Sequence, residues 1–269
     1  MAEIARRVAD SGITTKVPLA GPDEQYTVLD ETGRPWQCWT WLSGHRPRGS
    51  THEAEAMGSV LRRFHTELSA WQADTSTTHT PYWPDVIERH AILDAVRRLE
   101  LPPVAGRTAG DVVSSAYDLA GSTPNLRPAP GHNDCHADNF LMVDSGKRAA
   151  LFDFELVGSR PGAQATDLGV LMHRIARIAA QRTDAGDADR ALAAGRAAAA
   201  LARAYEAPAD LIAIAMHVAI RESLAKVLGC AGQGPPGLDR LGRRTIAANH
   251  CLYLAELLSL QQAKTVSAR

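Results

Sequence analysis

The chain has few cysteines and no long apolar segment. Its 269 residues contain only four cysteines, at positions 38, 135, 230 and 251, with no paired Cys-x-x-Cys spacing. This spacing argues against a zinc site. No apolar run approaches the roughly 20 residues of a membrane-spanning helix, and no apolar signal region follows the charged amino terminus. We therefore expect a protein of the cytoplasm, where unpaired cysteines stay reduced.

The chain also lacks a strong net charge. Its formal net charge is −1 and its sequence pI is near 6.8, so it has no overall basic field that would attract nucleic acid. We expect neither a nucleic-acid partner nor a membrane partner, and the sequence does not indicate an oligomeric state. Hydrophobic residues make up 45% of the chain, which is enough for a substantial core in one large domain or two lobes.

The most informative segment is residues 131–153, which read G-H-N-D-C-H-A-D-N-F-L-M-V-D-S-G-K-R-A-A-L-F-D. A polar loop is followed by an apolar run, a glycine-containing turn, a second apolar run and a carboxylate. This order predicts a catalytic loop, a β-hairpin and a metal-binding aspartate. Phosphoryl transfer needs a base near the acceptor hydroxyl and oxygen ligands for Mg²⁺. We predict Asp134 as the catalytic base and Asn139 and Asp153 as the Mg²⁺ ligands.

Simpler interpretations of the same residues remain. An Asp in a Gly-His-Asn-Asp loop can be an ordinary turn residue, because Asp and Asn hydrogen-bond their own backbone. His132 more often holds such a loop than transfers protons. His132, Cys135 and His136 together suggest zinc, but the cysteine spacing does not support it. The kinase interpretation depends on all the motifs occurring in order, because H-x-D alone is a weak signal.

These motifs resemble the aminoglycoside phosphotransferase family, which is related to choline kinase-like phosphotransferases. The family signature H-x-D-x-x-x-x-N is matched by His132, Asp134 and Asn139, and its D-F/W-E metal motif by residues 153–155. The T-D-L-G segment at residues 166–169 matches an Asp-Leu pair that opens a helix in the family. The resemblance covers roughly residues 3–170.

Upstream, G-R-P-W-Q-C-W-T-W-L-S-G at residues 33–44 resembles the last amino-lobe strand and hinge of the family, and L-R-R-F-H at residues 61–65 resembles the helix that follows. The resemblance implies ATP or GTP as phosphoryl donor, held near Thr40, Trp41 and Leu42. It also implies an α+β, protein kinase-like two-lobed fold. Residues 1–43 would form a truncated N-terminal lobe with the hinge, and residues 44–269 a mostly helical catalytic lobe.

Periodicity and turn signals predict the individual elements. Helices are expected at residues 2–11, from Thr51 (as N-cap) onward, and at 87–99, 110–119, 167–182, 187–205, 208–229 and 239–262. Strands are expected at 26–29 and 36–41 around a turn at 30–33, and a loop at 71–83. Three prolines at 124–130 fix the approach of the chain to the motif segment. In the helix after Thr51, one apolar stripe comprises Met57, Val60, Leu61, Phe64 and Leu68.

One family feature has no counterpart before the hinge. Related kinases place a lysine on an amino-lobe strand, where it pairs the nucleotide phosphates and a helix glutamate. Glu3 falls where the resemblance places that glutamate. Lys16 is the only lysine before the hinge, but it follows the first helix, so the resemblance assigns it no phosphate role. Either the native gene begins further upstream, or the protein binds the nucleotide with a truncated N-terminal lobe.

Three functional classes remain open. The first is an active kinase for a small-molecule hydroxyl, and the second a degenerate kinase-like protein that binds a ligand or partner without turnover. The third is an interaction protein that inherited the catalytic lobe. Retention of Asp134, Asn139 and Asp153 favours the first, because a decayed site would readily lose one of them. The acceptor stays open, since the family phosphorylates aminoglycoside, choline-like, sugar, homoserine and macrolide hydroxyls. Carboxylates that would suit a polycationic acceptor are Asp138, Glu155, Asp184, Asp187, Glu222 and Glu256, with Glu155 best placed.

Overall fold

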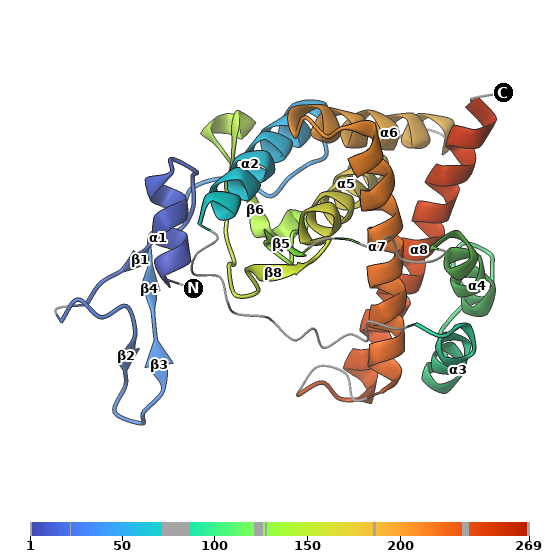
Figure 1. Cartoon of the computed structure of the whole chain (residues 1–269), viewed down its shortest axis with the longest axis horizontal. Coiled ribbons are helices and arrows are strands. Elements are labelled where there is room, and N and C mark those ends of the chain that lie inside the picture. Colours follow the sequence, from blue (N-terminus) through green and yellow to red (C-terminus); the bar gives the residue numbers. More distant parts are fainter. Residues whose placement is uncertain are drawn as a thin grey trace. The chain divides into compact units, whose positions relative to one another are not determined.

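The computed structural model describes residues 2–21, 23–71, 87–120, 126, 128–184, 187–232 and 237–267. The order of the elements along the chain is shown in Figure 1. The chain divides into two compact units, Met1–Thr78 with Pro128–Pro208, and His79–Arg127 with Ala209–Arg269. The predicted lobe boundary between residues 43 and 44 lies within the first unit and stays a prediction.

The first unit begins with helix α1 (Ala2–Asp10), which ends one residue before the predicted end. Gly12 adopts φ +79°, and its N–H donates to the carbonyl of Ala9 at 2.8 Å. A left-handed glycine of this kind is a common helix C-cap because it carries no Cβ. The guanidinium of Arg63 donates to the carbonyls of Ser11 and Gly12, so a longer-range contact also holds this turn.

The strands before the hinge form two short antiparallel ladders. Strand β1 (Pro18–Leu19) pairs with β4 (Cys38–Trp39), and β2 (Val28–Leu29) pairs with β3 (Pro35–Trp36). The turn between β2 and β3 lies where the sequence predicts, and the carboxylate of Asp30 accepts the Thr32 and Arg34 N–H groups there. The single strand predicted at residues 36–41 is wrong, because Gln37 separates two strands that pair with different partners.

Helix α2 (Thr51–Ala70) begins with a capping box. Its N-cap is Ser50, not Thr51 as predicted: the Ser50 side chain accepts the Glu53 N–H at 3.2 Å, and a Glu53 carboxylate oxygen accepts the Ser50 N–H at 3.1 Å. Four members of the predicted apolar stripe are completely buried, namely Met57, Leu61, Phe64 and Leu68. The fifth, Val60, is only partly buried.

Two further ladders frame the motif segment. Strand β6 (Phe140–Val143) pairs with β7 (Arg148–Leu151), which confirms the predicted hairpin. Strand β5 (Pro128–Gly131) pairs with β8 (Gly158–Pro161). Of the proline-containing approach at residues 124–130, residues 128–130 belong to β5, and most of the earlier part lies outside the described residues. Strand β8 has little intrinsic strand propensity, so its pairing with β5 was not predictable from sequence.

Two helices complete the first unit. Helix α5 (Ala163–Gln181) begins four residues before the predicted start at Asp167, after Gly162 with φ +68°. Helix α6 (Asp187–Ala204) agrees with its prediction and packs against α2 and α5. The approach is close at Gly58, where an added Cβ would lie 2.3 Å from the Leu201 carbonyl oxygen.

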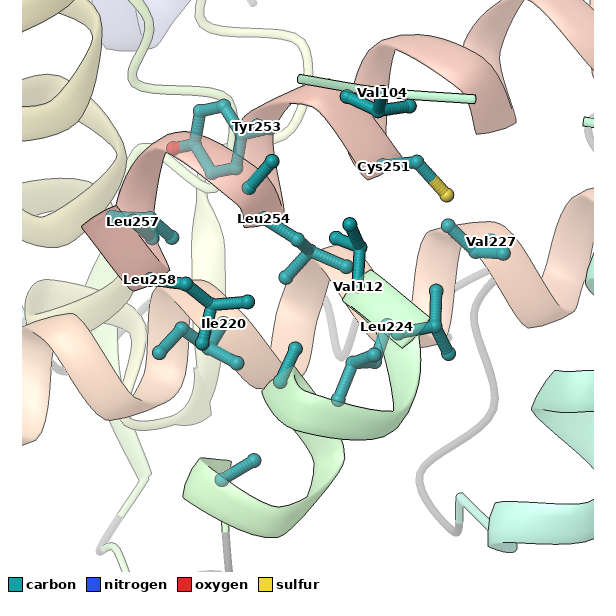
Figure 2. Packing of buried hydrophobic residues seen from close by; sticks show 14 of the residues in the cluster. Val104, Val112, Ile220, Leu224, Val227, Cys251, Tyr253, Leu254, Leu257 and Leu258 are labelled. Carbon is teal, nitrogen blue, oxygen red and sulfur yellow. The ribbon is translucent and has the colours of Figure 1, made fainter. Parts of the chain in front are cut away.

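The second unit consists of the helices α3 (Arg89–Leu99), α4 (Ala109–Ala120), α7 (Ala209–Ala231) and α8 (Arg240–Ser267). All four were predicted, with ends that differ by up to five residues. Their shared core is apolar, and Figure 2 shows Val112 of α4, Leu224 of α7 and Leu254 of α8 meeting there. Residues 72–83 of the predicted loop lie outside the described residues. No helix in the described ranges is long and apolar enough to cross a membrane.

Candidate active site

Asp134 and Asn139 are in contact within the loop that joins β5 to β6. The Asn139 side-chain amide donates to the backbone carbonyl of Asp134 at 2.9 Å, and its nitrogen lies 3.4 Å from the Asp134 Oδ2 atom. Asn139 is buried, whereas the Asp134 side chain is 38% exposed. The structure therefore brings the predicted base and one predicted metal ligand together, and leaves the carboxylate accessible to a substrate.

Asp153 follows the second strand of the hairpin directly. The N–H of Phe152, the preceding residue, donates to the backbone carbonyl of Asn139 at 3.1 Å. Asp153 itself is exposed and adopts φ +69°, a left-handed conformation that is uncommon for a residue with a Cβ. The next side chain, Phe154, is buried and stacks on Phe64 with ring centroids 5.6 Å apart. Consecutive residues of the metal motif thus differ in burial: the Asp153 carboxylate is exposed, and the Phe154 ring packs in the core.

The predicted hinge residues lie between two backbone pairings. Thr40 donates its N–H to the carbonyl of Val17 at 2.9 Å, and its hydroxyl accepts the Val17 N–H at 2.8 Å. After the hinge, His45 and Met142 of β6 exchange two backbone hydrogen bonds of 3.0 and 2.8 Å. Leu42 is partly buried, and the Trp41 side chain is 86% exposed. Because the Thr40 N–H already donates to the Val17 carbonyl, it is not available to a nucleotide.

The carboxylate of Asp167, on α5, holds the start of the catalytic loop. Its Oδ2 atom accepts the His132 N–H at 2.6 Å and its Oδ1 atom accepts the Asn133 N–H at 2.9 Å. Asp167 is only 1% exposed. An added Cβ on Gly131 would lie 2.7 Å from Oδ2, so the residue before His132 has to be glycine for the carboxylate to approach. The residues alone gave no signal for this contact, because it joins positions 34 and 35 residues apart; only the family resemblance singled out Asp167.

Two buried side chains extend this network. The Nε2 atom of His65, on α2, lies 3.0 Å from Asp167 Oδ2, and its Nδ1 atom lies 2.8 Å from the hydroxyl of Tyr205, just after α6. Burial, with the negative charge of Asp167, raises the pKa of Tyr205 and keeps its hydroxyl protonated. The imidazole of His65 thus shares one hydrogen bond with the protonated Tyr205 hydroxyl and donates another from Nε2 to the Asp167 carboxylate. The network joins α2, α5 and α6 to the catalytic loop.

His132 joins the same loop to the metal motif. Its Nε2 atom lies 3.0 Å from the carbonyl oxygen of Phe152, which accepts a hydrogen bond from the imidazole. The residue is completely buried, and desolvation lowers its pKa, so the imidazole is neutral and Nε2 carries the proton. Its ring also contacts Phe64 and Phe154. This is the loop-holding role that the sequence favoured for His132.

His136 lies close to the carboxylates of Asp134 and Asp138 in the loop. Its Nε2 atom lies 3.3 Å from Asp134 Oδ2, and its Nδ1 atom lies 3.8 Å from a carboxylate oxygen of Asp138. Asp138 is also paired with Arg46 at 2.6 Å, so its charge is already matched. Of the carboxylates suggested for a polycationic acceptor, Asp138 is therefore a weaker candidate than Glu155, which is exposed beside the metal motif.

The oxygen atoms of Asn139 and Asp153 suit a hard cation. The Asn139 side-chain nitrogen is turned toward Asp134, and within the described ranges no donor meets the Asn139 side-chain oxygen or the Asp153 carboxylate. Mg²⁺ commonly uses one or two protein oxygens and completes its shell with water and phosphate. No group of three or more His, Cys, Asp or Glu side chains in those ranges is arranged to hold a metal ion. The donor set thus fits Mg²⁺ bound together with a nucleotide.

The fold and the order of these motifs define a kinase-like phosphotransferase class. Residues 1–217 match the family model described as the phosphotransferase enzyme family, APH, and the chain belongs to that family. No curated protein sequence matches the chain.

Several solved structures share the fold. Spectinomycin phosphotransferase, solved with ADP and spectinomycin, aligns with a TM-score of 0.63 and 13% identity over 97% of this chain and 82% of its own. Amicoumacin kinase, solved with AMP-PNP and Ca²⁺, aligns at 0.55 and 13% over 94% and 75%. An aminoglycoside phosphotransferase from Alicyclobacillus acidocaldarius aligns at 0.54 and 16% over 97% and 81%. These similarities confirm the predicted α+β kinase-like fold.

Proposed function

We propose that this protein is a small-molecule kinase that transfers the γ-phosphoryl group of ATP or GTP to a substrate hydroxyl. Family membership supports the reaction class, and one observation supports the site: Asn139 contacts Asp134 through its side chain and pairs with Phe152, next to Asp153, through its backbone. The residues that carry the three polar side chains thus lie on chain segments joined by hydrogen bonds: Asn139 to Asp134 directly, and Asn139 to the residue before Asp153. In this proposal residues 1–43 form the smaller lobe and residues 44–269 the catalytic lobe.

Asp134 is the proposed catalytic base. Its exposed carboxylate accepts the proton of the acceptor hydroxyl while the hydroxyl oxygen forms a bond to the γ-phosphorus and the bond to the leaving nucleoside diphosphate breaks. The hydrogen bond from Asn139 to the Asp134 carbonyl fixes the backbone from which the carboxylate projects. Asn139 and Asp153 are the proposed Mg²⁺ ligands, and bound Mg²⁺ would neutralise charge on the transferred phosphoryl group.

The nucleotide is proposed to lie near Thr40, Trp41 and Leu42. The Trp41 ring is 86% exposed, so a purine can stack on it without displacing a protein neighbour. Spectinomycin phosphotransferase and amicoumacin kinase were solved with ADP and AMP-PNP, which supports an adenine nucleotide but leaves GTP open.

The acceptor is proposed to be a small hydroxyl compound, with an aminoglycoside as one member of the class. The structural relatives include proteins solved with spectinomycin and with glucosamine, which differ in size and charge. Glu155 is the carboxylate that we propose to contact a cationic acceptor. From the composition we also propose that the protein is located in the cytoplasm and that it has neither a nucleic-acid nor a membrane partner.

A direct test incubates the purified protein with Mg²⁺ and ATP or GTP and a panel of acceptors: aminoglycosides, spectinomycin, amino sugars, choline, homoserine and macrolides. Mass spectrometry of the acceptor is expected to show a gain of one phosphate with one compound class, and Asp134→Asn is expected to abolish it. Nucleotide binding without phosphorylation of any acceptor would favour the degenerate, ligand-binding class instead.

A further inference from the structure

The ammonium group of Lys16 lies beside the metal motif. Its Nζ atom is 4.7 Å from the centroid of the Phe152 ring, and Phe152 directly precedes Asp153. The side chains of Lys16 and Phe152 are both partly buried, whereas Asp153 is exposed. A cation over the face of an aromatic ring is held there by the ring's quadrupole and keeps its N–H donors for other partners.

The backbone on both sides of Lys16 is tethered to segments with proposed nucleotide roles. Before it, the carbonyl of Thr14 accepts the N–H of Leu151, at the end of β7, at 3.0 Å. After it, Val17 exchanges two hydrogen bonds with Thr40, the first hinge residue. Lys16 therefore lies on the short connection between the metal motif and the hinge. A nucleotide that contacts both of those segments would therefore lie near this connection.

The charge of Lys16 is not matched within the protein. Among the described residues, no carboxylate forms an ion pair with its ammonium group, which lies instead over the Phe152 ring. By contrast, Arg7 pairs with Glu3, and Arg46 pairs with Asp138. Lys16 is also the only lysine in the first 146 residues. A compact ammonium with unpaired donors, over the ring of the residue that precedes the proposed metal ligand Asp153, is well suited to a phosphate oxygen.

We propose that the Lys16 ammonium binds the phosphate chain of the nucleotide, an inference that rests on the proposed kinase function. The sequence order argued against a phosphate role, because the lysine follows α1. The structure nevertheless places Lys16 near the metal motif, because Thr14 is hydrogen-bonded to the end of β7 and Val17 to Thr40. The competing interpretation is purely structural: the lysine stem covers the Phe152 ring and contributes packing only.

The number of phosphates on the ligand distinguishes the two interpretations. Calorimetric titrations with ATP, ADP and adenosine in Mg²⁺ are compared for the unaltered protein, Lys16→Met, Lys16→Arg and Lys147→Met. Lys147 is an exposed lysine at the β6–β7 turn, so its replacement makes the same charge change away from Phe152. Lys16→Met is expected to weaken ATP binding about tenfold to a hundredfold and to leave adenosine binding unchanged. Lys16→Arg retains most of the ATP affinity, and Lys147→Met retains all of it.

Each alternative outcome has a distinct meaning. Unchanged ATP affinity in Lys16→Met overturns the assignment of Lys16 while leaving the proposed kinase function intact. Equal weakening of ATP and adenosine, with a lower Tm, also overturns it and supports the packing role. If the unaltered protein binds no ATP, the kinase function and the Lys16 assignment fall together. A selective loss of ATP affinity in a protein that phosphorylates no acceptor supports the Lys16 site and contradicts the transfer reaction.

Discussion

The Oδ2 atom of Asp167 lies 2.6 Å from the backbone nitrogen of His132, and the same oxygen is 3.0 Å from the imidazole of His65. One oxygen of a buried carboxylate thus accepts from the catalytic loop and from α2. Asp167→Asn replaces one carboxylate oxygen by a donor and leaves a buried N–H facing an NH₂ group. We expect a loss of about 3 kcal/mol in the free energy of unfolding, measured by urea denaturation. Unchanged stability would show that the loop does not depend on this carboxylate.

Tyr205 is hydrogen-bonded to His65 and so is linked to the Asp167 carboxylate through that imidazole. Tyr205→Phe removes the hydroxyl that is hydrogen-bonded to His65 Nδ1 and keeps the ring, so the expected loss of stability is about 1 kcal/mol. Because the effect reaches Asp134 only through the loop backbone, we expect kcat to fall several-fold while the KM for nucleotide stays constant. Tyr117→Phe, at a partly buried tyrosine of α4, controls for loss of a hydroxyl. Equal effects of the two substitutions would contradict a positioning role for Tyr205.

Gly131 is expected to tolerate no side chain. In Gly131→Ala the new methyl group would lie 2.7 Å from Asp167 Oδ2 and 2.8 Å from Ala163 Cβ, and neither neighbour is the end of a flexible chain. Overpacking of this kind costs about 1–3 kcal/mol, which thermal unfolding detects as a lower Tm. Gly195→Ala, within α6, meets no atom within 4 Å and should raise the Tm, because alanine favours a helix. A neutral Gly131→Ala would show that Asp167 and α5 can move away from β5.

The pH dependence of stability follows from His132. Burial lowers its pKa in the folded state, so below about pH 6.5 the unfolded chain takes up a proton that the folded protein does not. The free energy of unfolding is therefore expected to fall as the pH falls below about 6.5. Desolvation and Arg221 lower the pKa of His217 and contribute in the same direction. Urea titrations from neutral to mildly acidic pH test this, and the slope should be shallower in His132→Asn. Stability that increases on acidification would contradict a neutral buried His132.

Much of the fold was predictable because its signals are local. The β6–β7 hairpin follows from two apolar runs around a glycine turn, and the buried face of α2 follows from the spacing of Met57, Leu61, Phe64 and Leu68. The order of Asp134, Asn139 and Asp153 likewise allowed a site to be predicted before any geometry was known. The contact between Asp134 and Asn139 agrees with that interpretation, and the chemical roles of the three residues stay predictions.

The features that could not be predicted depend mainly on contacts between residues that are distant in the sequence. Asp167 and His65 are 102 residues apart, and no pattern within α2 or α5 indicates that they meet. Strand β8 is a strand because β5 supplies its hydrogen-bond partners, not because Gly, Ser, Arg and Pro favour extended structure. The N-cap of α2 was misplaced by one residue for a different reason: Ser50 and Thr51 are both good caps, and only the bond to Glu53 distinguishes them.

The central claim is that Asp134 is the base and Asp153 a ligand of the Mg²⁺ that accompanies the nucleotide. Asp134→Ala and Asp153→Ala should therefore differ when nucleotide affinity with and without Mg²⁺ and the rate of acceptor phosphorylation are measured on both. Asp134→Ala is predicted to lower the rate by about 10² to 10⁴ with unchanged Mg²⁺-dependent binding, because a base acts mainly in the transition state. Asp153→Ala is predicted to lower both the rate and the Mg²⁺-dependent part of the affinity, because a metal ligand also acts in the ground-state complex. Small and equal effects of the two substitutions would contradict the account.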